Sequence, residues 1–217
     1  MKKHLFKLID FVSILLKPIL NIRTMNLFRH IKNRLIWNSY KSNLKKICKS
    51  SNCGNNLKIH GHEYIEIGDN FSGGNNLTLE CWDSYRNSGK IYKPELIIGN
   101  NVTFTSDTQI SCLDKVVIGD NCLFGRYVYV SDNTHGKGDY SDLDIPPIER
   151  ELSSKGPVII GKNVWIGRCS TILSGVTIGD NAIIGANSLV NKDVPANAVV
   201  AGVPARVIKI VESDYLG

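Results

Sequence analysis

The sequence lacks an apolar run long enough to cross a membrane. Its most apolar stretch, residues 5–19, is interrupted by Asp10, Ser13 and Lys17, whereas a spanning helix needs about 20 successive apolar residues. No small-residue cleavage site follows this stretch, so the sequence does not predict a signal peptide.

Paired cysteines are also lacking. The spacing of the six cysteines matches no disulfide framework, and Cys48 and Cys53 have no second pair with which to form a structural zinc site. We therefore expect free thiols, no metal, and a reducing, cytoplasmic compartment.

The last third of the chain lacks a helical period and repeats every six residues instead. Apolar positions in a helix recur every three or four residues, so a period of six fits a short strand followed by a corner. Asn or Gly often stands three places later, as at Asn163 and Gly175, where a sharp corner demands left-handed backbone. Three such units close a triangular coil with parallel strands along its three faces. The repeat positions are Ile160, Ile166, Ile172, Ile178, Ile184 and Val190.

The same repeat continues upstream in two shorter runs. We expect a mainly β protein with a solenoid domain over residues 51–210, its coils spanning about 55–205, and a loop over residues 82–94. Residues 211–217 are expected to form a tail. The two runs are Ile98, Phe104 and Ile110, then Ile118, Phe124 and Val130.

The repeat is lost over residues 131–156. This segment is polar and contains Pro146 and Pro147, so we expect a long loop that leaves one corner and contacts substrate. His135 stands at its root, and histidine is the side chain best suited to accept a proton near neutral pH. On spacing alone, a single loop histidine is more often a surface residue with no catalytic role.

Acidic residues are nearly absent from residues 1–50. This segment holds twelve Lys or Arg and one acidic residue, Asp10, a formal charge of +11, whereas the remaining chain carries −5. Apolar residues recur there at helical spacing, which predicts a helix up to Pro18 and a second one over residues 26–47. The apolar positions are Leu5, Leu8, Ile9, Val12, Leu15, Leu16 and Ile19, then Leu27, Ile31 and Leu35.

Two compatible interpretations of this basic helical segment stay open. It is either an interfacial helix on the anionic inner face of a membrane, or a cap over the open end of the solenoid. No nucleic-acid-binding module accompanies the charge, so we do not expect a nucleic-acid partner.

Three motifs in the last third resemble those of a known superfamily. They are VWIG at residues 164–167, KDVP at residues 192–195 and AGVPAR at residues 201–206. Together they resemble the hexapeptide-repeat acyltransferases, most closely the maltose/galactoside and polysaccharide O-acetyltransferases. The resemblance covers residues 95–210 well, residues 55–95 loosely, and the basic segment not at all.

This resemblance implies a left-handed parallel β-helix, an exception to the right-handed crossover rule. It also implies a homotrimer with acetyl-CoA between neighbouring prisms. The family's catalytic histidine corresponds to His135, which would take the proton of a sugar hydroxyl as that hydroxyl attacks the thioester, without a metal or a covalent enzyme intermediate.

Further site residues are implied by the same resemblance. Asp132 and Asn133 would bind the acceptor or orient His135, as would one loop glutamate, Glu149 or Glu151, with Glu151 preferred. Arg168 departs from the family pattern, since some relatives carry a small residue there near the thioester. The residues implied for CoA are Trp165, Gly167, Gly185, Ala186, Lys192 and Arg206.

The acceptor is the least specified part of this prediction. The basic segment favours a capsular or O-antigen polysaccharide or its precursor over a small sugar or an antibiotic, which stay as alternatives. Serine acetyltransferases carry a larger helical domain that is absent here. A γ-type carbonic anhydrase holds zinc with three histidines, but here His60 and His62, expected on one side of a strand, lie far from His135 in the sequence. A non-catalytic solenoid would bind no CoA.

Overall fold

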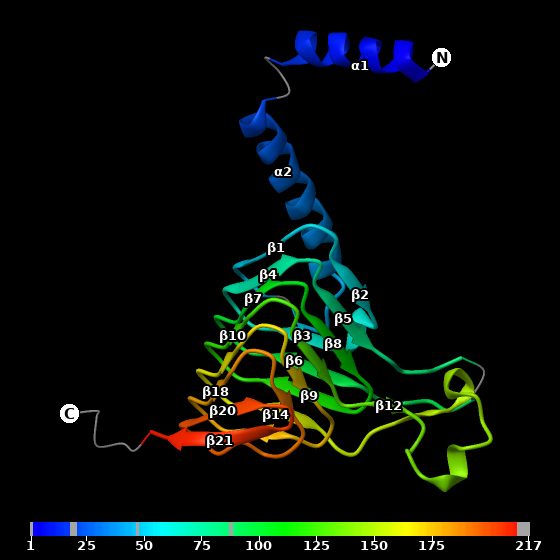
Figure 1. The fold of residues 1–217 in the computed structure, drawn as a ribbon, viewed down its shortest axis with the longest axis vertical. Coiled ribbons are helices and arrows are strands. Elements are labelled where there is room, and N and C mark those ends of the chain that lie inside the picture. Colours follow the sequence, from blue (N-terminus) through cyan, green and yellow to red (C-terminus); the bar gives the residue numbers. More distant parts are fainter. Residues whose placement is uncertain (1, 18–20, 47, 87–88, 212–217) are drawn as a thin grey trace.

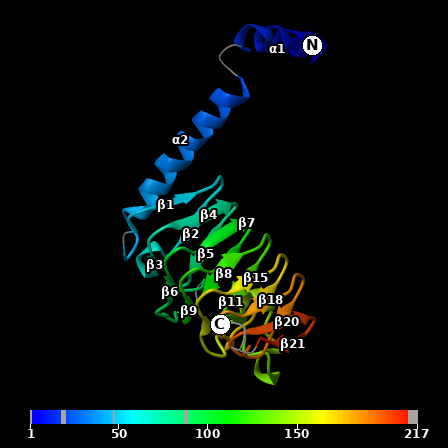
Figure 2. The same cartoon turned by 90° about the vertical axis from the view of Figure 1, so that its left-hand side faces the viewer.

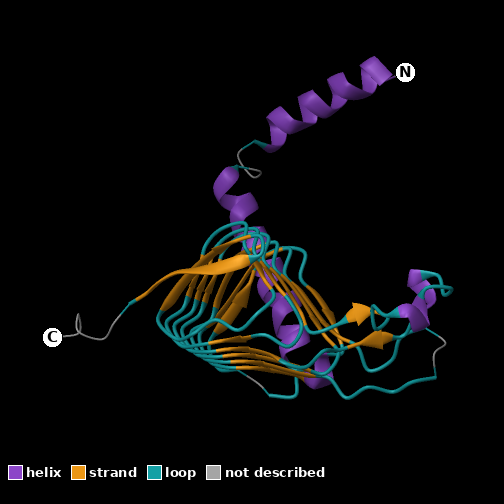
Figure 3. Cartoon of the chain, turned by 60° about the horizontal axis from the view of Figure 1, so that its bottom comes forward, coloured by secondary structure: helices purple, strands orange, loops and turns teal. Residues whose placement is uncertain are grey.

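The chain winds into a triangular prism whose axis runs along the stack of coils (Figures 1 and 3). The computed structural model describes residues 2–17, 21–46, 48–86 and 89–211. The predicted tail therefore lies almost wholly outside the described residues, as do Pro18, Ile19 and Ile47. The predicted left-handed parallel β-helix is confirmed.

Three parallel sheets form the faces of the prism, and each coil visits the 5-, 8- and 6-stranded sheets in turn. The 8-stranded sheet contains β1 (Ser51–Cys53), β4 (Phe71–Asn75), β7 (Thr103–Ser106), β10 (Leu123–Phe124), β15 (Trp165–Ile166), β18 (Ile183–Ile184), β20 (Ala198–Gly202) and the antiparallel β21 (Ala205–Ile210). The 6-stranded sheet contains β2 (Lys58–His60), β5 (Thr78–Cys81), β8 (Gln109–Cys112), β11 (Tyr129–Ser131), β16 (Thr171–Ile172) and β19 (Leu189–Val190). The 5-stranded sheet contains β3 (Ile65–Ile67), β6 (Glu95–Ile98), β9 (Lys115–Ile118), β14 (Val158–Ile160) and β17 (Thr177–Ile178).

The repeat positions predicted from the sequence form the core. All six positions of the last run, from Ile160 to Val190, are at most 1% exposed, because they point into the prism and stack on their counterparts in the next coil. Near the N-terminal end the inward residues are aromatic. The rings of Phe71, Phe104 and Phe124 stack edge-to-face, with centroids 5.5 and 4.6 Å apart.

The corner between the 5- and 8-stranded sheets is built from asparagines in left-handed backbone. Their φ angles lie between 56° and 61°, and each side-chain amide except that of the last, Asn197, donates to the side-chain carbonyl of the asparagine one coil further on, at 2.9–3.1 Å. The ladder thus satisfies polar groups along the corner while holding the coils in register. Its members are Asn70, Asn101, Asn121, Asn163, Asn181 and Asn197.

Two helices precede the first coil, and their bounds differ in part from the prediction. Helix α1 spans Lys2–Leu16, and α2 spans Ile22–Lys41 rather than residues 26–47. α2 begins early because the Asn21 side chain accepts hydrogen bonds from the amides of Arg23 and Thr24. It ends early because the Ser42 and Asn43 side chains bond back to the Ser39 carbonyl, after which the chain joins the 5-stranded sheet at Lys46.

The C-terminal half of α2 covers the open end of the solenoid. Trp37 is 1% exposed, packs on Phe71 and donates its indole N–H to the Ser51 hydroxyl at 2.9 Å. The first turns of α2 and all of α1 project away from the prism (Figure 2). Neither described helix is long and apolar enough to span a bilayer.

Smaller differences concern the first coils. The solenoid begins at β1, before residue 55, and the only regular pairing within the described part of loop 82–94 is a bridge between Ser84 and Ile91. The prediction that His60 and His62 share one side of a strand is wrong. Gly61 adopts φ 68° and ends β2, so that His62 starts the short helix η1 (His62–Tyr64).

The asparagine ladder yields a stability prediction. Asn163→Ala removes two ladder hydrogen bonds and strains the left-handed backbone, which together cost about 2–3 kcal/mol of unfolding free energy. Asn163→Gly keeps the backbone relaxed and is the matched control, with a loss of about 1–2 kcal/mol. Chemical denaturation should rank the wild type above the glycine variant and the glycine variant above the alanine variant. Equal losses for both variants would show that the left-handed backbone is not the constraint.

Candidate active site

The long excursion leaves the prism at the corner between the 6- and 5-stranded sheets. After β11 the chain forms β12 (Thr134–His135), which pairs antiparallel with β13 (Leu152–Ser153) as the excursion returns. The Gly136 amide donates to the Glu151 carbonyl at 2.7 Å. Two short helices, η2 (Tyr140–Asp142) and η3 (Pro147–Glu149), lie at its outer end (Figure 3). His135 therefore sits on a two-stranded stem rather than on a free loop.

Asp132 anchors the root of this stem. Its side chain is fully buried, and its two carboxylate oxygens accept the backbone amides of Leu113, Asp114 and Lys115 at 2.7–2.8 Å. Three charge-assisted bonds hold the chain where it leaves the coil. Burial keeps this carboxylate from touching an acceptor, and its predicted role in orienting His135 stays a prediction.

Asn133 belongs to a polar network next to the histidine. Its side-chain amide donates to the Ser111 hydroxyl at 3.0 Å and to Asp132 at 3.1 Å, and its backbone bonds to the Ser131 hydroxyl. The Trp82 indole N–H also reaches the Ser111 hydroxyl, at 3.2 Å. The network fixes Asn133 while leaving it partly exposed.

His135 opens onto a pocket of about 480 Å³ over the 6-stranded sheet. Its exposed imidazole lies against the Tyr85 ring, with centroids 5.3 Å apart, and the Tyr85 ring in turn meets the Trp82 ring edge-on. The remaining lining residues are Glu80, Gln109, Ser111, Tyr129, Ser131, Asn133, Thr134, Leu152 and Leu173. An exposed imidazole beside two aromatic rings and several polar side chains suits a hydroxylated substrate with apolar faces.

Sequence reasoning missed Trp82 and Tyr85. Both lie in loop 82–94, where no periodic pattern identifies a residue as functional. The Tyr85 hydroxyl reaches the Ile148 carbonyl at 3.4 Å, and the Tyr92 hydroxyl donates to the Leu152 carbonyl at 2.9 Å. Loop 82–94 thus packs against the excursion although some 60 residues separate them. A cluster of aromatics in a polar loop was the one signal available.

The predicted loop glutamates lie away from the imidazole. The Glu151 carboxylate is 3.4 Å from the Lys90 ammonium in loop 82–94, and Glu149 lies exposed in η3. Among the residues that the structure describes, neither carboxylate hydrogen-bonds to His135. The assignment of Glu151 to the site stays a prediction.

The residues predicted to hold CoA occupy other parts of the prism. Trp165 is 52% exposed on the 8-stranded sheet, between Leu123 and Ile183 in register. Arg206 lies exposed on β21 of the same sheet, whereas Lys192 follows β19 at the corner from which the excursion leaves. A triangular prism places that corner opposite the 8-stranded face (Figure 3). Within one chain, His135 and Trp165 therefore lie on opposite sides.

The two predicted glycines have a structural explanation. A Cβ at Gly167 would come within 2.6 Å of the Ala186 amide nitrogen in the next coil, and one at Gly185 within 2.8 Å of the Ala201 Cβ. Close stacking of coils thus demands glycine at both positions. Ala186 is exposed at the same corner.

Buried thiols and histidines do not form a second site. Burial raises the pKa of Cys53 to about 12 and that of Cys122 to about 11, which keeps both thiols protonated and unreactive at neutral pH. The His60 ring packs on Trp82 with centroids 4.8 Å apart. Within the described ranges no three His, Cys, Asp or Glu side chains cluster as metal ligands.

The anchoring of the stem yields a second prediction. In Asp132→Asn, one of the two carboxylate oxygens that accept backbone amides becomes an NH2 group, which cannot accept a hydrogen bond. We expect a loss of about 1–3 kcal/mol of unfolding free energy. We expect a lower thermal unfolding midpoint and a fall in kcat at unchanged pH profile, because the base itself is intact. Asp114→Asn, which changes an exposed carboxylate nearby, is the control. A shifted pH profile in Asp132→Asn would instead indicate direct electrostatic coupling to the histidine.

Comparisons with known proteins indicate the family to which the chain belongs. Residues 157–192 match the bacterial transferase hexapeptide family (six repeats), and residues 115–131 match the hexapeptide repeat of succinyl-transferase. A putative lipopolysaccharide biosynthesis O-acetyl transferase, WbbJ of Escherichia coli K12, is 36% identical over 149 residues, covering 67% of this chain and 71% of that protein. The galactoside O-acetyltransferase of the same strain is 42% identical over 125 residues, 54% of this chain and 55% of that protein.

Solved structures share the fold. A galactoside acetyltransferase in complex with coenzyme A superposes with a TM-score of 0.50 at 26% identity, covering 85% of this chain and 81% of that one. AntD, an N-acyltransferase from Bacillus cereus in complex with dTDP and coenzyme A, reaches a TM-score of 0.65 at 20% identity, covering 83% and 90%, and supports the fold alone. The chain therefore belongs to the hexapeptide-repeat acyltransferase superfamily, as an acetyl-CoA-dependent O-acetyltransferase.

Proposed function

We propose that the protein acetylates a hydroxyl of a sugar within a larger glycan, with His135 as the general base. The observation that carries this proposal is the exposed imidazole beside Tyr85, on a stem anchored by Asp132, at the mouth of a pocket. The lipopolysaccharide-biosynthesis and galactoside O-acetyltransferases named above support a carbohydrate acceptor.

The reaction needs one base and two oriented substrates. The imidazole takes the proton of the sugar hydroxyl as its oxygen attacks the thioester carbonyl of acetyl-CoA. The tetrahedral intermediate collapses with cleavage of the C–S bond, and the imidazolium returns the proton to the departing thiolate. Much of the rate enhancement comes from holding hydroxyl and thioester together.

Aromatic walls support a sugar rather than a charged small molecule as acceptor. The faces of pyranose rings carry C–H groups that pack on aromatic rings, while their hydroxyls need polar partners. Trp82 and Tyr85 provide the former, and Gln109 and Asn133 the latter.

The working enzyme in this proposal is a homotrimer with each active site between two chains. His135 and Trp165 lie on opposite sides of one prism, so a neighbouring prism must bring its 8-stranded face to the excursion for both to act on one substrate pair. Closed rings of identical subunits supply such heterologous contacts at every interface.

His135→Ala is expected to lower the rate of acetyl transfer about 10²–10⁴-fold. The rate is measured as thiol release from acetyl-CoA with a galactoside or polysaccharide acceptor. CoA binding and the thermal unfolding midpoint should be unchanged, since the imidazole is exposed. Trp165→Ala should weaken CoA binding and transfer. Retained transfer in His135→Ala would refute the role of the base.

Mixing His135→Ala with Trp165→Ala tests whether the site lies between subunits. In trimers reassembled from equal amounts, a wild-type His135 meets a wild-type Trp165 at about one quarter of the interfaces, so about a quarter of wild-type activity returns. Each variant refolded alone is the control. No recovery in verified mixed trimers would place both residues in a site made by one chain.

We also propose that α1 lies on an anionic membrane surface and brings the enzyme to its glycan. Leu5, Ile9, Val12 and Leu16 form one stripe at helical spacing, and all are exposed. Lys7 lies within the helix and Lys17 directly follows it, so an interfacial position buries the stripe and brings these cations near anionic lipid.

Vesicle binding tests this placement. Val12→Asn with Leu16→Asn should lower the affinity for anionic vesicles at least about tenfold, because each lost apolar side chain gives up about 1.5–3 kcal/mol. Ser13→Asn is the matched control, and binding of the wild type should weaken as salt rises. Unchanged cosedimentation of the double variant would exclude α1 as the anchor.

A further inference from the structure

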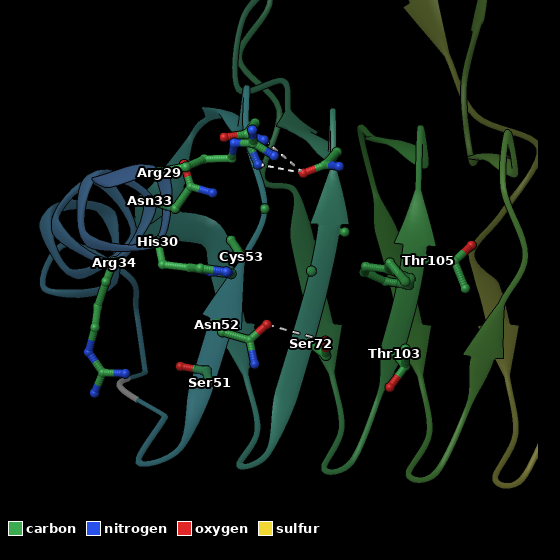
Figure 4. Close-up of a pocket in the computed structure, with 16 residues that line it drawn as sticks. Arg29, His30, Asn33, Arg34, Ser51, Asn52, Cys53, Ser72, Thr103 and Thr105 are labelled. Atoms are coloured by element: carbon green, nitrogen blue, oxygen red, sulfur yellow. Dashed lines mark hydrogen bonds between the residues drawn. The ribbon is translucent and has the colours of Figure 1, made fainter. Parts of the chain in front are cut away.

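A basic groove lies at the end of the prism remote from the C-terminal hairpin. It has a volume of about 800 Å³ and runs between α2 and the outer face of β1, β4 and β7 (Figure 4). Because Trp37 clamps the C-terminal half of α2 to the prism, the preceding two turns stand over the edge of the 8-stranded sheet. The groove is thus a built feature of the cap.

The helical wall of the groove is cationic. Arg29 and His30 extend from α2 toward β1 in Figure 4, with Asn33 beside them, and Arg34 lies one turn beyond His30 at the edge. No lining residue is acidic. Among the described residues neither arginine forms an ion pair with a carboxylate.

The sheet wall adds neutral donors that face these cations. Ser72 donates its hydroxyl to the Asn52 carbonyl at 3.3 Å, which leaves the Asn52 amide N–H groups for a ligand. Thr103 stands next to Ser72 in register on β7. Donors on both walls and no lining carboxylate fit an anion, and the Arg29 guanidinium, which reaches toward the sheet wall in Figure 4, suits the oxygens of a phosphate.

The groove shares its face of the prism with Trp165. One outward row of residues crosses the 8-stranded sheet in register, from the groove to the tryptophan. Four strand spacings of about 4.8 Å separate its ends, a distance of about 19 Å. The row is Asn52, Ser72, Thr103, Leu123 and Trp165.

We propose that this groove binds the phosphate or diphosphate group that joins the acceptor glycan to its carrier. The proposal rests on the proposed function, since the glycan would run from the groove along the sheet to the acetylation site near Trp165. The substrate class is then a phosphate-linked oligosaccharide, and recognition of its linkage is separate from recognition of the acetylated sugar.

Binding of inorganic pyrophosphate tests the groove without reference to catalysis. Calorimetric titration is done on the full-length protein saturated with CoA, so that the CoA site cannot take the probe. Arg29→Gln with Arg34→Gln should lower pyrophosphate affinity at least about tenfold, because each charge-assisted bond contributes about 1.5–3 kcal/mol. Arg23→Gln with Lys32→Gln, on the same helix but outside the groove, removes equal charge and should change little. Equal loss in both double variants, or no loss in the first, overturns the site.

Acetylation kinetics connect the groove to the acceptor. The groove variant should raise KM for a diphosphate-linked oligosaccharide while leaving kcat, and the KM for the phosphate-free oligosaccharide, unchanged. Equal KM changes for both acceptors would overturn the proposal. Failure of His135→Ala to lose activity would count against the catalytic assignment but not against pyrophosphate binding.

The source of the phosphate is distinguished by two competitors. Phosphatidylcholine vesicles that carry a polyprenyl diphosphate should displace pyrophosphate if the carrier is a lipid, and a soluble nucleotide diphosphate should do so if the carrier is a nucleotide. Displacement by neither overturns the proposed ligand class.

Discussion

The structure depends on one backbone constraint, the left-handed residue at the two corners that flank the 8-stranded sheet. At the corner that enters this sheet the residue is asparagine, whose side-chain amide reaches the same position one coil away. The ladder from Asn70 to Asn197 shows the constraint repeated six times. Flat faces, inward isoleucines and strict stacking all follow from it, since each coil must return to the same place.

Leaving such a stack has a structural requirement. The amides of Leu113, Asp114 and Lys115 lose their partners in the next coil where the chain departs after β11, and a buried orphan donor is costly. The Asp132 carboxylate accepts hydrogen bonds from these three amides in place of the missing backbone acceptors. The residue that makes the excursion possible thereby fixes the direction of the stem that carries His135. The Asp132 side chain therefore contributes both to the stability of the solenoid and to the placement of His135.

Sequence reasoning went far where the period is regular. It predicted the inward residues from Ile160 to Val190 and the corner asparagines, because stacking repeats the same demand at fixed spacing. The superfamily was predicted from the resemblance of the three motifs at residues 164–167, 192–195 and 201–206. It did not separate Asp132 from the ligand-binding residues, since a buried anchor and an exposed contact look alike in an Asp-Asn turn. Tyr85 and Trp82 were missed because tertiary packing alone brings loop 82–94 to the excursion. The bounds of α2 were wrong because the Asn21 cap, not the apolar stripe, decides where the helix begins.

The stacked coils also fix a distance along the prism. Each coil adds one strand to every face, so the separation between the α2 end of the prism and Trp165 is a whole number of strand spacings, about 4.8 Å each. Evolution can lengthen this separation only by inserting complete coils, whereas loops at the corners vary freely without altering it. The number of coils between β1 and β15 therefore fixes the distance between these strands along the 8-stranded face. Most substitutions leave this distance unchanged, and it changes only by whole strand spacings.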